Sequence, residues 1–153
     1  MNWSTAPTED QAEAIRARAS FFRRMTPEQR AVLASLTELQ ELPAGAEIYK
    51  VGDEAHFLYV LVDGMVRFSL PMGQRQATAG EIIRRGELFG WAALIEGAQR
   101  RIATASCITA CTALAIDGRM LIRLMASDHS LGYAVMREVS LLISSTLTAY
   151  AAG

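Results

Sequence analysis

Residues 85–104, RGELFGWAALIEGAQRRIAT, join two predicted strands through a glycine-punctuated turn and a single turn of helix. Gly86 and Gly90 mark the exit from the first strand, and residues 91–95 can form the helical turn. A helix start presents unpaired backbone N–H groups and the positive end of a dipole, so it favours an anion. Arg101 re-enters beside it and can supply a bidentate contact. The stretch therefore predicts a phosphate site that needs no P-loop.

Short apolar or alternating segments lie on both sides of this stretch, and turn residues separate them. The predicted strands are residues 39–42, 47–49, 57–62, 65–70, 76–83, 101–108 and 112–116. Among the turns, Asp63-Gly64 suits a two-residue hairpin between the strands that flank it. Short strands at this spacing predict an antiparallel barrel or jelly roll.

Helical patterns occupy the two ends of the chain. Residues 8–25 favour a helix, and Thr26 followed by Pro27 forms a helix start with a cap and a first-position proline. Residues 120–125 predict a short amphipathic helix after the strands. Ser127 or Asp128 can cap a second helix that runs to about Tyr150, since its apolar residues recur at intervals of three and four.

The length of 153 residues fits one domain, with helices over 1–36, strands over 37–117 and helices over 118–150. The net charge of −1 gives no basic field that would attract nucleic acid, so direct DNA binding is not expected. The acidic N-terminus is unlike a signal peptide, and no apolar run approaches the roughly 20 residues of a membrane span. A cytoplasmic location is the expectation.

Neither the cysteines nor the histidines form a chemical motif. Cys107 and Cys111 lie four residues apart in successive predicted strands, and small core residues are the favoured interpretation. His56 and His129 fall in different elements, without a nucleophile or metal-ligand spacing near either. We therefore expect no catalytic residue, no metal site and no enzymatic activity.

Five short motifs, in this order and spacing, resemble the cyclic-nucleotide-binding domain of catabolite-activator-type regulators, kinase regulatory subunits and gated channels. They are LPAG at 42–45, Gly52-Asp53, LYVLVDG at 58–64, GELFG at 86–90 and RIATA at 101–105. The resemblance covers residues 22–148. It implies an α+β fold, in which an antiparallel β jelly-roll barrel is flanked by N-terminal helices and two C-terminal helices.

The opening stretch resembles the phosphate-binding cassette of that family. Phe89 and Gly90 match its start, Ala92, Ala93 and Leu94 match its helix, and Arg101, Ile102 and Ala103 match its close. The resemblance implies that Arg101, rather than the neighbouring Arg100, pairs with a cyclic phosphate. It also implies that backbone amides near Ala92, Ala93 and residues 102–103 complete the cradle. The expected ligand is cyclic AMP, cyclic GMP or a related anionic nucleotide, with no separate cofactor.

Trp91 departs from the family pattern, which carries at this place a glutamate that accepts the ribose 2′-hydroxyl proton. An indole N–H is a donor only, and losing a charge-assisted hydrogen bond costs about 1.5–3 kcal/mol. Three orientations remain open for Trp91. It can stack on the purine or ribose, fill the pocket so that nothing binds, or point outward as a partner contact. Ile102 is a second departure, from a small hydroxyl residue.

In the family, a polar residue of the final helix reads the purine edge. An ungapped count from Asp117 places Thr146 there, with Ser145 beside it. A structural role remains open, in which these hydroxyls bond to the preceding helical turn. Tyr150 is another candidate, as a cover for the pocket mouth.

These patterns favour a non-enzymatic sensor that binds a cyclic nucleotide and repositions its terminal helices. The alternative is a ligand-independent scaffold for dimerisation or for an effector protein, and Trp91 motivates it. The apolar face of the last helix can pack on the strands or on the same helix of a second subunit.

Overall fold

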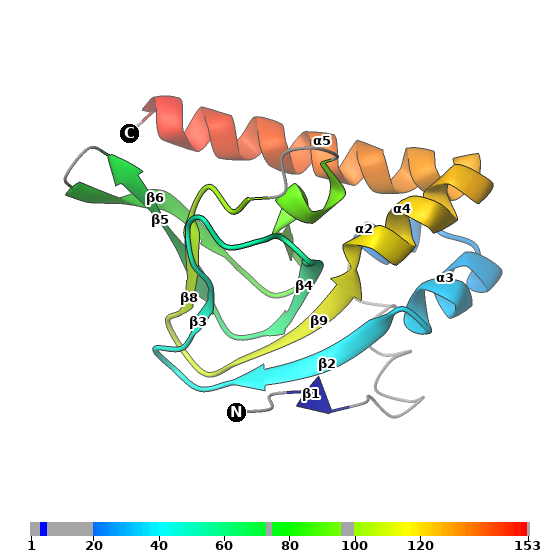
Figure 1. Ribbon diagram of the computed structural model, residues 1–153, viewed down its shortest axis with the longest axis horizontal. Helices are drawn as coiled ribbons and strands as arrows, with labels where there is room; N and C mark the ends of the chain where they lie inside the picture. The colour runs from blue at the N-terminus through cyan, green and yellow to red at the C-terminus, as the bar shows by residue number, and fades with distance from the viewer. Residues whose placement is uncertain (1–3, 6–19, 73–74, 96–99, 153) are drawn as a thin grey trace.

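The computed structural model describes residues 4–5, 20–72, 75–95 and 100–152, and it has two antiparallel sheets with helices on one side (Figure 1). The first sheet has the order β1 (Ser4–Thr5), β2 (Thr37–Leu42), β9 (Cys111–Asp117), β4 (Phe57–Asp63) and β7 (Leu88–Phe89). The second has the order β3 (Glu47–Tyr49), β8 (Thr104–Cys107), β5 (Val66–Met72) and β6 (Arg75–Ile83). This arrangement confirms the predicted jelly roll.

Strand β4, an inner strand of the first sheet, is buried on both faces, which explains its nearly continuous apolar sequence. Leu58 and Val60 contribute to a core shared with the helices, whereas Tyr59 and Leu61 point into the core between the two sheets. Successive side chains of a strand point to opposite faces, so alternate residues serve different cores. The first sheet is thus the middle layer of the molecule.

Four helices pack against the outer face of the first sheet or beside it: α2 (Ser20–Arg23), α3 (Pro27–Ala34), α4 (Gly118–Ser127) and α5 (His129–Ala152). The longest, α5, runs across the molecule from α4 to the end of the β5–β6 pair (Figure 1). Its residues Leu131, Val135 and Val139 are fully buried in the shared core. The same helix therefore reaches both the helical layer and the second sheet.

The N-terminal predictions are confirmed in part. Thr26 caps α3, because its hydroxyl accepts from the Gln29 amide at 3.2 Å and the Gln29 side chain accepts from the Thr26 amide at 3.0 Å. Of the helix predicted over 8–25, the structure has α2 at Ser20–Arg23, and residues 8–19 lie outside the described residues. The short strand β1, which pairs with β2, was not predicted.

The predicted hairpin at Asp63-Gly64 is wrong. β4 pairs with β9 and β7, so it has no free edge, and β5 pairs with β6 and β8 in the other sheet. The turn is present, since Gly64 has φ +97°, but it carries the chain from one sheet to the other.

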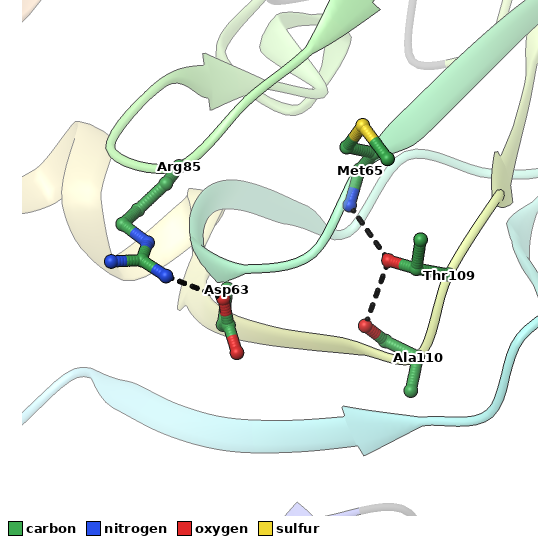
Figure 2. Close-up of polar contacts among 5 residues, drawn as sticks. All are labelled: Asp63, Met65, Arg85, Thr109 and Ala110. Carbon is green, nitrogen blue, oxygen red and sulfur yellow. Dashed lines mark hydrogen bonds and ion pairs between the residues drawn. The ribbon is translucent and has the colours of Figure 1, made fainter.

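Polar contacts hold both sides of this crossover (Figure 2). The Arg85 guanidinium donates to Asp63 Oδ1 at 2.9 Å and lowers the pKa of that carboxyl. The Met65 amide donates to the Thr109 hydroxyl at 3.1 Å, and that hydroxyl donates to the Ala110 carbonyl. The crossover is thus tied to the start of the 85–104 stretch and to the β8–β9 turn.

Both cysteines are buried thiols of the core between the sheets. Burial, followed by the hydrogen bond with Cys111, raises the pKa of Cys107 to about 12. The thiolate is the reactive form of cysteine, so Cys107 is held in its unreactive state at neutral pH.

Candidate ligand-binding site

The 85–104 stretch forms a short strand, a left-handed turn and a 3₁₀ helix. β7 ends at Phe89, Gly90 has φ +80°, and the helix η1 covers Trp91–Leu94. This confirms the predicted helical turn after Gly90. Ala92, Ala93 and Leu94 are buried, which ties η1 closely to the body of the protein.

Gly90 is needed for its conformation and for its lack of a side chain. Its φ of +80° belongs to the left-handed region, which L-residues adopt at a cost. A Cβ at this position would lie 3.0 Å from the Tyr59 ring, 3.1 Å from Arg101 Nη1 and 3.2 Å from the Phe57 carbonyl oxygen. The close approach leaves room for the Arg101 guanidinium beneath the turn.

Arg101 lies before β8 rather than within it, because its backbone bonds to the loop between β3 and β4. Its amide donates to the Asp53 carbonyl and its carbonyl accepts from the Gly52 amide, both at 2.8 Å. The predicted strand 101–108 therefore begins later, at Thr104. These two backbone bonds fix the point from which the Arg101 side chain enters the interior.

The Arg101 guanidinium joins the cassette to strand β4. Nη1 donates to the Gly90 carbonyl at 2.9 Å, and Nη2 donates to the Phe57 carbonyl at 2.7 Å. The guanidinium carbon lies 4.1 Å from the centre of the Tyr49 ring and 5.9 Å from that of Tyr59. Such cation–π contacts stabilise a cation that has lost part of its hydration.

Arg101 is the one buried charged residue among those that the structure describes, with 4% of the residue's surface exposed. Burial lowers the pKa of Arg101, while Tyr49, Tyr59 and Asp53 oppose that change, and an arginine remains protonated in proteins. Within the described part of the chain, no carboxylate forms an ion pair with it, and its buried Nε–H has no hydrogen-bond acceptor. A buried cation without an acid partner favours an anion beside it.

A cavity of about 40 Å³ opens against this guanidinium. Its walls come from β3, β5, β7, η1, the segment before β8, and α5; the lining residues are Tyr49, Phe68, Phe89, Gly90, Trp91, Ala92, Arg101, Ile102, Ala103 and Leu142. The described lining is mainly aromatic and aliphatic around one cation. The space is far smaller than the several hundred Å³ of a typical ligand pocket, so this conformation has no room for a nucleotide.

Seven of the nine predicted ligand-binding residues line the cavity together: Phe89, Gly90, Trp91, Ala92, Arg101, Ile102 and Ala103. Ala93 is not in the lining; its amide donates to the Gly90 carbonyl at 3.4 Å, and it packs with Ala55. Thr146 belongs to α5, but its side chain lies outside the described residues.

Sequence reasoning missed three residues of the wall. Tyr49, Phe68 and Leu142 come from β3, β5 and α5, each distant in sequence from the 85–104 stretch. The sequence signals for these three residues were the alternation of apolar and polar residues along the strands and the apolar stripe of α5. Such signals mark a buried face without saying what it faces.

Trp91 is half-buried and faces the cavity. It packs against the core shared with the helices and against the cluster of Ala55, Ala92 and Ala93. The outward orientation is therefore not the one observed. Stacking on a ligand and filling of the pocket both remain consistent with this position.

Helix α4 begins directly against the cassette. A Cβ at Gly118 would lie 2.6 Å from the Ala93 carbonyl oxygen and 3.0 Å from the Ala93 Cβ, and the Gly118 amide donates to the His56 carbonyl at 2.9 Å. The contact brings η1 directly against the first residue of α4. A displacement of η1 would consequently press on the helical layer.

The two-sheet fold, the cassette turn and the enclosed arginine define a ligand-binding jelly-roll domain. The sequence profile of the cyclic nucleotide-binding domain matches residues 39–128, and this chain belongs to that family of regulatory domains. A search of curated proteins finds no match.

Solved structures share the fold at low sequence identity. A cyclic nucleotide-binding domain from Methylobacillus flagellatus has a TM-score of 0.78 and 18% identity, covering 96% of this chain and 84% of the other. The sensor domain of the transcriptional regulator DNR from Pseudomonas aeruginosa has a TM-score of 0.70 and 19% identity, covering 84% and 91%. The catabolite activator protein of Thermus thermophilus has a TM-score of 0.70 and 22% identity, covering 82% and 58%. None of the helices described for this chain is long and apolar enough to cross a membrane.

Proposed function

We propose that this chain is a non-enzymatic sensor domain that binds a cyclic mononucleotide, cyclic AMP or cyclic GMP, or a related anionic nucleotide, and signals through its C-terminal helix. The carrying observation is the buried Arg101 guanidinium, which faces the cavity without an acid partner among the described residues. The family supports a cyclic nucleotide as the anion.

Arg101 retains donors for a phosphate while it holds the cassette. A guanidinium carries five N–H groups, and two nitrogens use one donor each on Gly90 and Phe57. The buried Nε–H and an adjacent η hydrogen can donate side-on to two phosphate oxygens. Binding would then need no break in the contacts that connect the cassette with β4.

Ligand entry has to enlarge the cavity, because about 40 Å³ cannot hold a nucleotide. Leu142 of α5 lines this space, as does Trp91 at the start of η1. A ligand that holds these residues apart favours a different position of α5, and that differential affinity transmits the signal. The close contact of Gly118 with Ala93 offers a second route, through α4.

The contact between Thr146 of α5 and the purine stays a prediction. Cytoplasmic location and the lack of direct DNA binding also stay predictions.

Isothermal titration with cyclic AMP and cyclic GMP tests the proposal. We expect binding by the unmodified chain, and at least a tenfold loss in Arg101→Gln, which removes the charge. Arg100→Gln is the matched control, since Arg100 is an exposed neighbour that bonds to the Gly52 carbonyl and pairs with Glu54. Circular dichroism and thermal unfolding would establish that both variants fold. Absence of heat with either nucleotide would remove the sensor function.

The small size of the cavity and the inward position of Trp91 favour one alternative, a ligand-independent domain that binds a partner protein or itself. Under this alternative, neither nucleotide binds the unmodified chain, and recovery of nucleotide binding in Trp91→Glu would show that Trp91 fills the cavity. Binding by the unmodified chain at micromolar affinity would contradict it.

We also propose that α5 mediates a homodimer. Its exposed side carries Tyr133 and Leu141, which are 73% and 58% exposed. Arg137 and Glu138 are the only Asp, Glu, Lys or Arg residues between His129 and Ala152. A long helix this poor in charge is typical of a face that is covered in an assembly.

A further inference from the structure

Within the described part of the cavity wall around Arg101, few side chains could hydrogen-bond to a sugar hydroxyl. Among its described lining side chains, Phe68, Phe89, Ala92, Ile102, Ala103 and Leu142 are purely apolar, and none of the ten residues is acidic. The guanidinium and the Trp91 indole are donors only. Among the described lining residues, Tyr49 is the one whose side chain has a hydroxyl oxygen.

The covalent structure of a cyclic nucleotide decides which part of the wall its 2′-hydroxyl meets. The cyclic phosphate bridges O3′ and O5′, and the carbon that carries the 2′-hydroxyl is bonded to the C3′ carbon. The 2′-hydroxyl therefore lies close to the phosphate, wherever the base is placed. Since Arg101 is the cation for the phosphate, this hydroxyl meets residues adjacent to Arg101 in the wall.

Apart from Tyr49, whose ring lies against the guanidinium, the described side chains beside Arg101 are apolar or donate only. The Gly90 carbonyl oxygen already accepts from Arg101 Nη1 and from the Ala93 amide, and the next residue is Trp91. Ile102 follows Arg101 in the chain and lines the same cavity. A hydroxyl that is buried beside Trp91 and Ile102 loses its hydrogen bonds to water and gains no side-chain acceptor from either residue, which opposes binding.

Resting on the proposed function, we propose that this site does not select the ribose 2′-hydroxyl, so that it binds 2′-deoxy cyclic nucleotides at least as well as the ribose forms. Trp91 is the residue that sets this specificity. An acceptor at position 91 would create a preference for ribose, whereas another aromatic residue would not.

The decisive measurement is the ratio of two dissociation constants for the unmodified chain, by titration with cyclic AMP and with 2′-deoxy cyclic AMP. We expect the deoxy ligand to bind within threefold of the ribose ligand or more tightly. A deoxy ligand that binds more than threefold weaker overturns the inference, while cyclic AMP binding itself upholds the proposed function. If cyclic GMP is the nucleotide that binds, the same ratio is measured with cyclic GMP and its 2′-deoxy form. Binding by none of these ligands removes the proposed function and this inference together.

Two substitutions at position 91 give an independent check. Trp91→Gln supplies a neutral acceptor, and we expect it to raise the preference for cyclic AMP over the deoxy form about tenfold. Trp91→Phe keeps an apolar ring and should leave the ratio as in the unmodified chain. Tyr49→Phe completes the set, because loss of a ribose preference in this variant would assign the reading of the hydroxyl to Tyr49 and contradict the proposal.

Discussion

Arg101 is at once part of the fold and the cation of the candidate site. Its guanidinium donates to Gly90 and Phe57, and it stacks on Tyr49. The motif around it allowed Arg101, Phe89 and Gly90 to be predicted from the sequence, since these residues are close together in the chain. The aromatic support from Tyr49 could not be predicted, because nothing in the chain specifies which side chain of a distant strand lies under a given arginine.

Gly90→Ala tests how tightly the cassette turn encloses that guanidinium. A left-handed φ costs about 1–2 kcal/mol in any L-residue. The added Cβ also meets Tyr59, Arg101 and Phe57 at 3.0–3.2 Å. We expect a loss in the free energy of unfolding that exceeds the conformational cost by a further 1 kcal/mol or so. Urea denaturation measures the loss.

Gly52→Ala is the matched control for this substitution. Gly52 has φ +88°, but a Cβ there would meet nothing within 4 Å. The control therefore carries the conformational cost without the steric cost. Equal losses in the two variants would show that Gly90 is required for its backbone conformation alone.

At the scale of elements, the period of the sequence pattern located several strands correctly. The predicted pairing of two of those strands across Asp63-Gly64 was wrong. β3 was predicted with its observed bounds, and the observed β4 and β9 extend the predicted segments by one or two residues. The hairpin at Asp63-Gly64 failed because turn chemistry determines a change of direction, whereas pairing depends on which strand edges are free. β4 already lies between β9 and β7.

The Gln29 side chain connects helix α3 to the junction between α4 and α5. The side-chain nitrogen Nε2 of Gln29 donates to Asp128 Oδ2 at 3.3 Å, while Gln29 Oε1 accepts from the backbone amide of Thr26. Asp128 in turn caps α5, since its Oδ1 accepts from the Leu131 amide at 3.1 Å. The caps of α3 and α5 are thus parts of one hydrogen-bonded chain.

Gln29→Glu breaks this chain at a single point. The carboxylate can still accept from the Thr26 amide, but it faces Asp128 with like charge and without a donor. We expect the free energy of unfolding to fall by about 1 kcal/mol, and by less at high salt, because salt screens the repulsion. Combining it with Asp128→Asn, whose amide can donate to the new carboxylate, should recover most of the loss. A double-mutant cycle that shows independent effects would contradict the connection.

At the scale of the whole molecule, the balance of charge and apolar surface separates α5 from the rest. The chain carries 15 Lys and Arg residues and 16 Asp and Glu residues, yet only two of these 31 lie in the 24 residues of α5. The inner side of α5 packs on the core that the helices share with the first sheet, which confirms the predicted packing within the chain. The sequence could not distinguish this packing from contact with a second copy, because an apolar stripe is equally suited to packing within one chain and between two.

The exposed side of α5 predicts contact with a second copy of the chain, in addition to the packing of its inner side within the chain. Tyr133 and Leu141 lie two turns apart on a helix about 36 Å long, enough to bury a standard interface against a second copy. We expect sedimentation equilibrium to give twice the chain mass of 16.7 kDa, and Leu141→Arg to shift the mass toward the monomer by burying an unpaired charge. Val32→Arg is the control, an exposed apolar residue of α3 that is 45% exposed and should leave the mass unchanged. A monomeric unmodified chain at micromolar concentration would exclude this dimer.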